Sequence, residues 1–435
     1  MKKLLAIVLA MAMVLSLAAC GGSSAPATEA PKADAPAAEA PAAEAPAAEE
    51  HQPVTIEFLC WGAAETTTAD AFNAMVEGFM AKYPWITVEV TECNYDAVNT
   101  TLLTRAASQS APDVAQVSNQ WVAALYEMDA LTALDDIMAA ESIADYYEGA
   151  KSGTTIGGKV YSAPWIMQPM TMYCNMDLIK AAGYDAVPAT WDEYVEQCYA
   201  IAKLGTNADG NTVYGRSLAS TVLVGAGYFS LIDVWSNGGE FSDADGNICF
   251  YSDGTVAAYT ELQNMVKAGV IAPGLQIVDN RSLFGNGQIG FHFDAPSQVA
   301  NFSNVNLEVA QVPGGNSFSS DHHLVAFQNS EHPEECALLI DYLSGPEGMD
   351  LYTDYNDVIC ARTSVEELEF FSNMTGNMQV FFEAAGVAKS LPVQSSNFPA
   401  AMEAIAEGIQ RVVIGMEDVD TVIKDVDAEL VKMYG

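Results

Sequence analysis

The spacing of hydrophobic residues changes repeatedly along the chain from residue 54 onward. Every second residue is hydrophobic over 54–58 and again over 86–90, which predicts two β-strands. Between them, hydrophobic residues recur with helical spacing until Pro84 ends the pattern. A second helix around 98–107 and a third short strand at 113–117 follow. Strand, helix, strand, helix and strand in this order predict a parallel α/β sheet.

Two local signals refine this picture further along the chain. Thr190 and Glu193 have the spacing of a capping box, which predicts that a helix starts there. The segment 285–290 matches the glycine pattern of a dinucleotide site. That site needs a strand before the glycines and a helix after them, but here a hydrophobic strand at 289–293 follows. We therefore interpret the segment as a turn.

The N-terminus has the pattern of an export signal. Two lysines precede a hydrophobic stretch over 4–15, which is short for a bilayer crossing. Leu-Ala-Ala-Cys at 17–20 resembles the bacterial lipobox, which implies a signal peptide over 1–19 and a lipid on Cys20. Two or three acyl chains would hold the protein durably on the outer face of the cytoplasmic membrane. The alternative is an ordinary secretory signal with an incidental cysteine.

A tether is expected after the signal, over 20–53. Proline recurs every five residues from Pro26 to Pro46 among alanines and glutamates, a composition that cannot pack a core. The folded body is therefore expected to begin at about residue 54 and to contain about 380 residues.

Charge excludes one large class of functions. The chain has 57 acidic residues against 17 lysines and arginines, a formal net charge of −40. Nucleic-acid binding is excluded because it depends on cations that neutralise phosphates. The same field opposes a strongly anionic ligand.

The sequence lacks an assembled catalytic or cofactor motif. It has no His-Glu-x-x-His and no Gly-x-Ser-x-Gly, and its histidines show no metal-ligand spacing. Seven cysteines follow Cys20, an odd number without the short spacing of zinc or redox sites, so we interpret them as buried thiols. We expect no cofactor and no metal.

Tryptophans follow several predicted strands. Trp61, Trp121 and Trp165 each come after or within a short hydrophobic segment, and Trp235 precedes a glycine pair. Ligands of open α/β sheets bind at the carboxyl ends of strands. Flat rings beside neutral polar groups and carboxylates suit a sugar, which has a C–H face and a rim of hydroxyls. The alternative for each tryptophan is core packing.

An ordered series of segments resembles the family 1 extracellular solute-binding proteins of ABC importers. The resemblance extends from Val54 to the C-terminus. Its segments are 79–84 before a strand, 111–114, 158–164, 175–178, 188–193, 235–241 and 332–335. The resemblance implies a two-lobed α/β fold of the type II periplasmic-binding-protein kind, with the ligand between the lobes. It also implies that the first lobe takes 54–163 and 312–345, and the second 164–311 and 346–435.

The resemblance also implies which residues face the ligand. Carried over position by position, the set is Trp61, Glu65, Ser118, Asn119, Gln120, Trp165, Gln168, Trp235, Asp294, Ser297, His322 and Phe398. Within it, we expect Trp165 and Trp235 to stack on the ligand, and Glu65, Gln168 and Asp294 to bond its hydroxyls.

Some positions depart from the family pattern. Many members have Asn-Gly-Pro-Trp where this chain has 294–297, and a glycine pair where it has 321–322. Arg362 could be structural or could line the cleft.

The sequence as a whole predicts a lipid-anchored, non-enzymatic binding protein that captures a mono- or oligosaccharide. It would be a monomer that presents the ligand to the permease of an ABC importer. Two alternatives stay open at this point. The same scaffold could bind a cation such as a polyamine, since the chain is acidic, or the protein could be a surface hydrolase acting on carbohydrate.

Overall fold

The computed structural model of the protein describes residues 51–66, 68–151, 153–243, 246–374, 376–389, 391 and 395–434. The predicted signal peptide, Cys20 and the tether up to residue 50 lie outside these residues. No helix in the described part of the chain is both long enough and apolar enough to span a membrane.

The first sheet begins as the hydrophobic spacing predicts. β1 (Val54–Cys60) pairs in parallel with β2 (Ile86–Glu92) and with β3 (Val114–Ser118). The connecting helices are α1 (Ala69–Lys82) and α2 (Tyr95–Ala107). The predicted alternation of strands and helices is confirmed, although α2 starts a few residues earlier than expected.

Three later strands complete the first sheet, whose spatial order is β12-β6-β11-β3-β1-β2. β11 (His322–Ala326) runs antiparallel to β3 and to β6 (Ala163–Met167). β12 (Ile359–Cys360) pairs antiparallel with β6 at the edge. The carboxyl ends of β1, β3 and β6 therefore lie next to the start of β11, along the edge of the sheet at which these three strands end.

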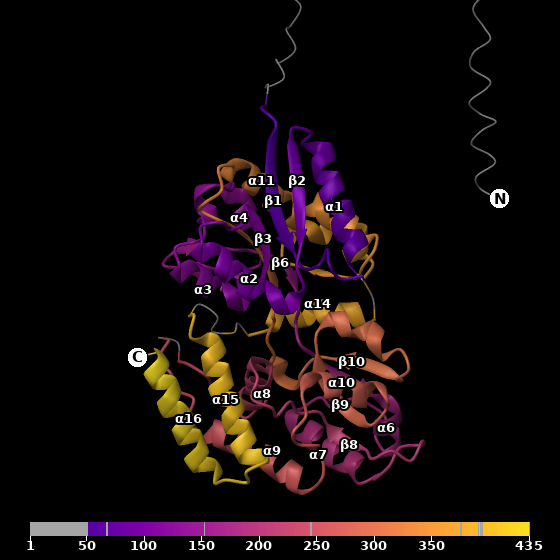
Figure 1. Cartoon of the computed structure of the whole chain (residues 1–435). Coiled ribbons are helices and arrows are strands. Elements are labelled where there is room, and N and C mark those ends of the chain that lie inside the picture. Colours follow the sequence, from indigo (N-terminus) through magenta and orange to yellow (C-terminus); the bar gives the residue numbers. More distant parts are fainter. Residues whose placement is uncertain are drawn as a thin grey trace, which may run out of the picture. The chain divides into compact units, whose positions relative to one another are not determined.

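One face of α1 explains how helices cover this sheet. Its buried residues are Ala71, Phe72, Met75, Val76 and Phe79, which recur at helical spacing. This face packs toward the sheet, where α1 lies beside β2 (Figure 1). α1 also contacts α11 (Pro333–Ser344) and α12 (Pro346–Thr353). The smaller elements around this sheet are α3 (Val122–Glu127), α4 (Ala140–Ala144), α5 (Glu148–Lys151), β4 (Thr155–Ile156), β5 (Lys159–Val160), α13 (Glu369–Ser372) and α14 (Asn377–Val387).

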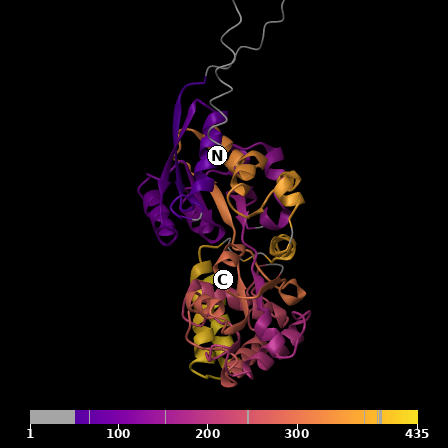
Figure 2. The same cartoon turned by 90° about the vertical axis from the view of Figure 1, so that its right-hand side faces the viewer.

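The second sheet has four strands in the order β10-β7-β9-β8. β7 (Thr171–Asn175) runs antiparallel to β10 (Leu307–Ala310) and to β9 (Ile289–Asp294), and β8 (Tyr214–Arg216) is parallel to β9. The helices around it are α6 (Met176–Ala181), α7 (Trp191–Ala202), α8 (Val224–Ser236), α9 (Asp253–Lys267), α10 (Ile277–Gly285), α15 (Phe398–Val413) and α16 (Val419–Tyr434). Figure 2 shows both sheets with their helices from the side.

Both local predictions for this part of the chain are confirmed. The Thr190 hydroxyl accepts the Glu193 backbone N–H at 3.2 Å, and the Glu193 carboxylate accepts the Thr190 N–H at 3.3 Å, so a capping box starts α7. The segment 285–290 spans the end of α10, a turn at 286–288 and the start of β9. Gly287 has a φ of +68° in this turn, a conformation that favours glycine.

We call the part built on the first sheet the first lobe and the part built on the second sheet the second lobe. The sheets correct the predicted boundaries at two places. β6, which begins at Ala163, continues to Met167 as a strand of the first sheet. α12 and β12 also belong to the first lobe, because α12 packs on α1 and α11 and β12 pairs with β6. The described chain links the two sheets through 168–170 and 311–321.

Arg362 has a structural role. It is 4% exposed, and its guanidinium donates to Asp341 in α11 at 2.8 Å and to the Tyr146 hydroxyl at 2.9 Å. It also lies 4.5 Å from the centre of the Tyr146 ring. The seven cysteines are free, and five of them are the buried thiols that the sequence predicts. The prediction is wrong for Cys93 and Cys249, which are partly exposed.

Candidate functional site

Four rings meet at the edge of the first sheet where β1 and β3 end. Trp61 follows β1, Trp121 follows β3, Tyr95 starts α2 and His322 starts β11. Trp61 contacts the other three at centroid distances of 5.5 Å to Tyr95, 5.7 Å to Trp121 and 4.9 Å to His322. We call these four rings the first-lobe aromatic cluster. Trp61 is 2% exposed and Tyr95 is 41% exposed, so Tyr95 gives the cluster its accessible surface.

Gln116 holds this cluster in place from within β3. Its side chain is fully buried, and its Oε1 accepts the Cys60 Sγ–H and the Gly62 N–H, both at 3.0 Å. Its Nε2 lies 3.4 Å from His322 Nδ1. One amide therefore fixes both the turn that carries Trp61 and the ring of His322.

Asp321 is hydrogen-bonded to both links between the lobes and to the segment that follows β3. Its carboxylate accepts the Gln168 N–H at 2.9 Å and the Ser319 hydroxyl, and its carbonyl accepts the Asn119 N–H at 3.0 Å. Gln168 lies in the first link, and Ser319 and Asp321 lie in the second.

Three buried polar atoms beside these links have no partner among the described residues. They are Asn119 Oδ1, Gln168 Oε1 and Thr171 Oγ1. Asn119 follows β3, Gln168 follows β6, and Thr171 starts β7, where it pairs in register with Asp294. The described residues contain thirteen buried side-chain atoms without a partner, and these three are distinguished by their place at the links, where a ligand could supply the missing hydrogen bonds.

Aromatic residues of α8 face the links from the second lobe. The rings of Tyr228 and Phe229 lie 5.2 Å and 5.5 Å from that of Phe318 in the second link. Burial raises the pKa of Tyr228, and Tyr95, Asp294 and Arg281 also act on it electrostatically. The ring contacts of Tyr228 among the described residues are with Phe229 and Phe318, so its ring lies against the second link.

Asp294 ends β9 with both carboxylate oxygens engaged. Arg281 donates to them at 2.7 Å and 2.9 Å, His292 Nε2 lies 2.9 Å from Oδ2, and the Ala295 N–H donates to Oδ1 at 2.9 Å. Burial alone would raise the pKa of Asp294, but the hydrogen bonds from His292 and Arg281 outweigh it and lower the pKa. This corrects the prediction that Asp294 bonds ligand hydroxyls. The carboxylate instead holds Arg281, whose side chain is 33% exposed.

Three predicted aromatic contacts are core residues instead. Trp165 is 1% exposed, packs against Phe58 and Phe72, and donates its Nε1–H to the Leu343 carbonyl at 2.9 Å. Trp235 is 6% exposed, and the Lys389 ammonium lies 5.2 Å from its ring centre. Phe398 is fully buried at the start of α15. The predicted stacking by Trp165 and Trp235 is wrong for this arrangement, because core side chains or a lysine occupy the space beside their rings.

The other predicted residues fall into two groups. Those at the edge of the first sheet and its link lie together, namely Trp61, Ser118, Asn119, Gln120, Gln168 and His322. Glu65 is exposed in the turn between β1 and α1, and Ser297 is exposed after β9.

Sequence reasoning missed Tyr95, Tyr228, Phe229 and Arg281. The glycine before Tyr228 is the one sequence feature that could have indicated where α8 packs. A Cβ on Gly227 would lie 2.0 Å from the Met402 carbonyl oxygen, so α8 and α15 can only pack this closely at a glycine. This close packing fixes the position of α8, which carries Tyr228 and Phe229.

Three consecutive side chains at the start of β11 have shifted pKa values. Burial raises the pKa of Asp321 to about 6, although the hydrogen bonds from Ser319 and Gln168 oppose the shift. Burial lowers the pKa of His322 to about 4 and that of His323 to about 3, the latter helped by the neighbouring His322.

These shifts predict how Asp321→Asn changes the dependence of stability on pH. Between about pH 6.5 and 4, the unfolded chain protonates both histidines while the folded protein does not, so they cost stability as the pH falls. Asp321 acts oppositely between about pH 6 and 4, because the folded protein takes up its proton first. Asp321→Asn removes this opposing contribution, so acidification should destabilise the variant more steeply than the wild type. Urea unfolding from pH 7 to 4.5 measures this, and equal slopes would contradict it.

Comparisons with known proteins agree with this fold. A family model described as bacterial extracellular solute-binding protein matches residues 63–350. A predicted binding protein of Brucella abortus (strain 2308) is 23% identical over 374 residues, which cover 83% of this chain and 89% of that protein. A Deinococcus radiodurans protein named "probable ABC transporter-binding protein" is 22% identical over 328 residues, which cover 69% of this chain and 76% of that protein.

A solved structure with the same fold is the cyclic alpha-maltosyl-1,6-maltose binding protein from Arthrobacter globiformis. It aligns with a TM-score of 0.77 at 20% identity, covering 88% of this chain and 99% of that one. This likeness confirms the predicted two-lobed α/β fold. Since the family model matches more than half of the chain, the chain belongs to the bacterial extracellular solute-binding proteins.

Proposed function

We propose that this solute-binding protein captures a neutral mono- or oligosaccharide between its two lobes and leaves it chemically unchanged. The observation that carries the proposal is the set of three unpartnered buried polar atoms, on Asn119, Gln168 and Thr171, at the links between the lobes. Aromatic rings lie at the end of the first sheet and against the second link. A sugar offers hydroxyls to such atoms and C–H faces to rings such as Tyr95 and Tyr228.

The charged groups of the site favour a neutral ligand over a polyamine. A polyamine needs carboxylates that are free to pair with its ammonium groups. Asp294 is already paired with Arg281, and Asp321 is buried and hydrogen-bonded to the links. The cation alternative therefore loses one of the two carboxylates, Glu65 and Asp294, on which it depended.

The state of Asp294 argues against a hydrolase. Glycoside hydrolysis uses two carboxyl groups on either side of the bond that is cleaved, one as an acid and one as a base or nucleophile. Asp294 is held as an anion by Arg281 and His292, which prevents it from donating a proton. The relatives in the family are binding proteins, which supports the same conclusion.

The proposed partners follow from the family and the N-terminal sequence. The protein would hand its ligand to the permease of an ABC importer, as the name of the Deinococcus radiodurans relative suggests. It would act as a monomer anchored by a lipid on Cys20 to the outer face of the membrane. Membrane fractionation of a Cys20→Ala variant tests the anchor, since the processed variant should leave the membrane.

A thermal-shift screen tests the proposed ligand class. The purified protein is mixed with neutral mono- and oligosaccharides and, separately, with spermidine. A ligand present at 100 times its dissociation constant stabilises the folded protein by about 2.7 kcal/mol. We expect a shift with at least one sugar and recovery of that sugar intact by chromatography. Stabilisation by spermidine alone, or cleavage of the sugar, would contradict the proposal.

Tyr228→Ala should weaken sugar binding about 30-fold. A stacked aromatic residue in a desolvated site contributes about 2 kcal/mol to binding. Tyr228→Phe keeps the ring and should bind more tightly than Tyr228→Ala. The matched control is Tyr355→Ala, because Tyr355 is 55% exposed outside the site. Calorimetric titration with the best sugar of the screen measures all three variants. Equal affinities for wild type and Tyr228→Ala would exclude Tyr228 as a ligand contact.

A further inference from the structure

Arg281 lies at the end of the second sheet that adjoins the links. It belongs to α10, which covers one face of this sheet. Phe284 of the same helix packs on the rings of Tyr173 and His292, at centroid distances of 6.3 Å and 5.6 Å. Arg281 precedes Phe284 by three positions, so both lie on one side of α10. From there Arg281 bonds Asp294, the last residue of β9.

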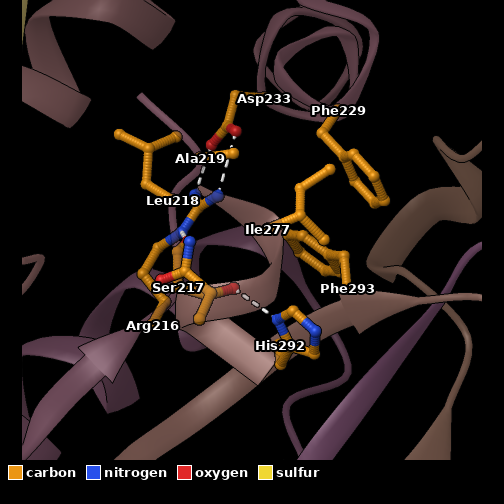
Figure 3. Close-up of a pocket in the computed structure, with 10 residues that line it drawn as sticks. Arg216, Ser217, Leu218, Ala219, Phe229, Asp233, Ile277, His292 and Phe293 are labelled. Carbon is orange, nitrogen blue, oxygen red and sulfur yellow. Dashed lines mark hydrogen bonds and ion pairs between the residues drawn. The ribbon is translucent and has the colours of Figure 1, made fainter. Parts of the chain in front are cut away.

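Asp294 holds the Arg281 guanidinium from one side only. The carboxylate is 1% exposed and accepts from Nε and NH2 of Arg281, whereas the Arg281 side chain is 33% exposed. His292 bonds the same carboxylate, and its other ring nitrogen lies 2.8 Å from the Ser217 hydroxyl (Figure 3). NH1 of Arg281 has no hydrogen-bond partner among the described residues, so its N–H groups can donate to a ligand.

The other two arginines of the second lobe differ from Arg281. Arg216 also binds an aspartate with two nitrogens, but it is 3% exposed and its Nε donates to a backbone carbonyl (Figure 3). Arg411 is 28% exposed, but its partners Glu417 and Asp425 are exposed as well, at 47% and 56%. Of the three, only Arg281 combines a buried carboxylate partner with an accessible guanidinium. Such a group is held in position before a ligand arrives, which lowers the cost of binding.

The groups beside Arg281 indicate what its free nitrogen would bind. Thr171 pairs in register with Asp294, so their side chains lie on the same face of the sheet with Cβ atoms about 5 Å apart. Thr171 Oγ1 and, three residues earlier, Gln168 Oε1 are buried and unpartnered. An amide oxygen only accepts hydrogen bonds and an arginine only donates them. A sugar suits both, because each of its hydroxyls donates one hydrogen bond and accepts others.

The charge of Arg281 is already balanced within the protein. Asp294 pairs with it directly, and the formal net charge of −40 opposes an anionic ligand. The free nitrogen therefore offers directed donors to a neutral oxygen atom rather than an unpaired charge to an anion.

We propose that Arg281 is a second-lobe ligand contact that selects the sugar, because its NH1 donates to one particular hydroxyl oxygen. This inference rests on the proposed function, since the acceptor belongs to a sugar. It adds a specificity determinant: a sugar without this hydroxyl should bind more weakly than a sugar that has it.

The main test combines removal of hydroxyls from the sugar with Arg281→Lys in the protein. Calorimetry measures glucose, maltose and maltotriose, and then the monodeoxy derivatives of the tightest binder among them. Lysine keeps a cation beside Asp294 but lacks the forked guanidinium, so Arg281→Lys should bind the parent sugar at least about tenfold more weakly. The matched control is Arg411→Lys in the last turn of α15, which should bind as wild type does.

The derivatives distinguish a ligand contact from a structural role. One monodeoxy sugar should bind wild type at least about tenfold more weakly than the parent sugar, but should bind Arg281→Lys almost as well as the parent does. A structural role of Arg281 would leave the loss for every derivative equal in the two proteins. That result, or wild-type affinity of Arg281→Lys for the parent sugar, would overturn the inference.

A second measurement needs only the wild type, in case Arg281→Lys does not fold. Phenylglyoxal modifies arginine side chains, and peptide mass spectrometry gives the rate at each of them. The bound sugar should slow the modification of Arg281 and leave that of Arg411 unchanged. Equal rates at Arg281 with and without the sugar would overturn the inference.

Glucuronate separates this inference from the proposed function. Binding of glucuronate that Arg281→Lys weakens at least about tenfold, without binding of any neutral sugar, would contradict the proposed function and leave Arg281 as a ligand contact. Binding of a neutral sugar that is independent of Arg281 would overturn the inference alone.

Discussion

Trp165→Ala is expected to lower the free energy of unfolding by about 3–5 kcal/mol. Trp165 is 1% exposed, its ring lies 5.2 Å from that of Phe72 and 6.4 Å from that of Phe58, and its Nε1–H is bonded to Leu343. Alanine would leave a cavity in the first lobe and a carbonyl without its partner. Urea unfolding measures the loss.

The matched control for this prediction is Trp85→Ala. Trp85 is only partly buried, beside β2, so its removal should cost clearly less. Sugar affinity of Trp165→Ala, measured well below its melting temperature, should stay within about threefold of wild type. Wild-type stability combined with lost binding would restore Trp165 to the ligand contacts and contradict the structure.

Asp233→Ala should destabilise the second lobe by about 3–5 kcal/mol as well. The Arg216–Asp233 ion pair is almost completely buried, so removing the carboxylate leaves a guanidinium without its counter-charge inside the protein. The double variant Arg216→Met with Asp233→Leu removes both charges and keeps similar side-chain volumes. It should recover most of the lost stability, because buried ion pairs replaced by apolar side chains are often no less stable.

Urea unfolding of the single and the double variant separates the two causes of this loss. We expect the single variant to be much less stable than the double variant. If the two were equally unstable, the uncompensated charge would not be the cause, and lost packing around the ion pair would explain the result.

Local patterns predicted local structure in this chain. The alternation over 54–58 and the helical spacing of Phe72, Met75 and Phe79 depend only on which face of an element is buried. The capping box at Thr190 closes between residues three positions apart. These interactions need no knowledge of the tertiary fold, so the sequence was sufficient to predict them.

The functional residues depend on contacts between distant segments. Asp294 is a carboxylate at the end of a strand, which is typical of a ligand contact. However, Arg281 in α10 pairs with both of its oxygens, so they are not available to a ligand. Trp165 lies near the start of β6, as a residue at a strand end would in the sequence. However, β6 is an inner strand of the first sheet, and the ring of Trp165 is buried in the core. A tryptophan in the core and one in a binding site have the same sequence signature.

Tyr228 illustrates the opposite case. It lies within a helix and at no predicted strand end, so the rule used for tryptophans passed over it. Only the packing of α8 against α15 and the course of the second link place its ring beside Phe318.

Capture of a neutral sugar between the lobes is best examined by calorimetric titration of wild type, Tyr95→Ala and Tyr228→Ala. Tyr95 belongs to the first lobe and Tyr228 to the second, and the titrant is the sugar that gives the largest thermal shift. We expect one sugar per chain, recovered intact, and at least tenfold weaker binding in each variant. Binding that depends on only one of the two tyrosines, or a protein that binds spermidine and no sugar, would contradict it.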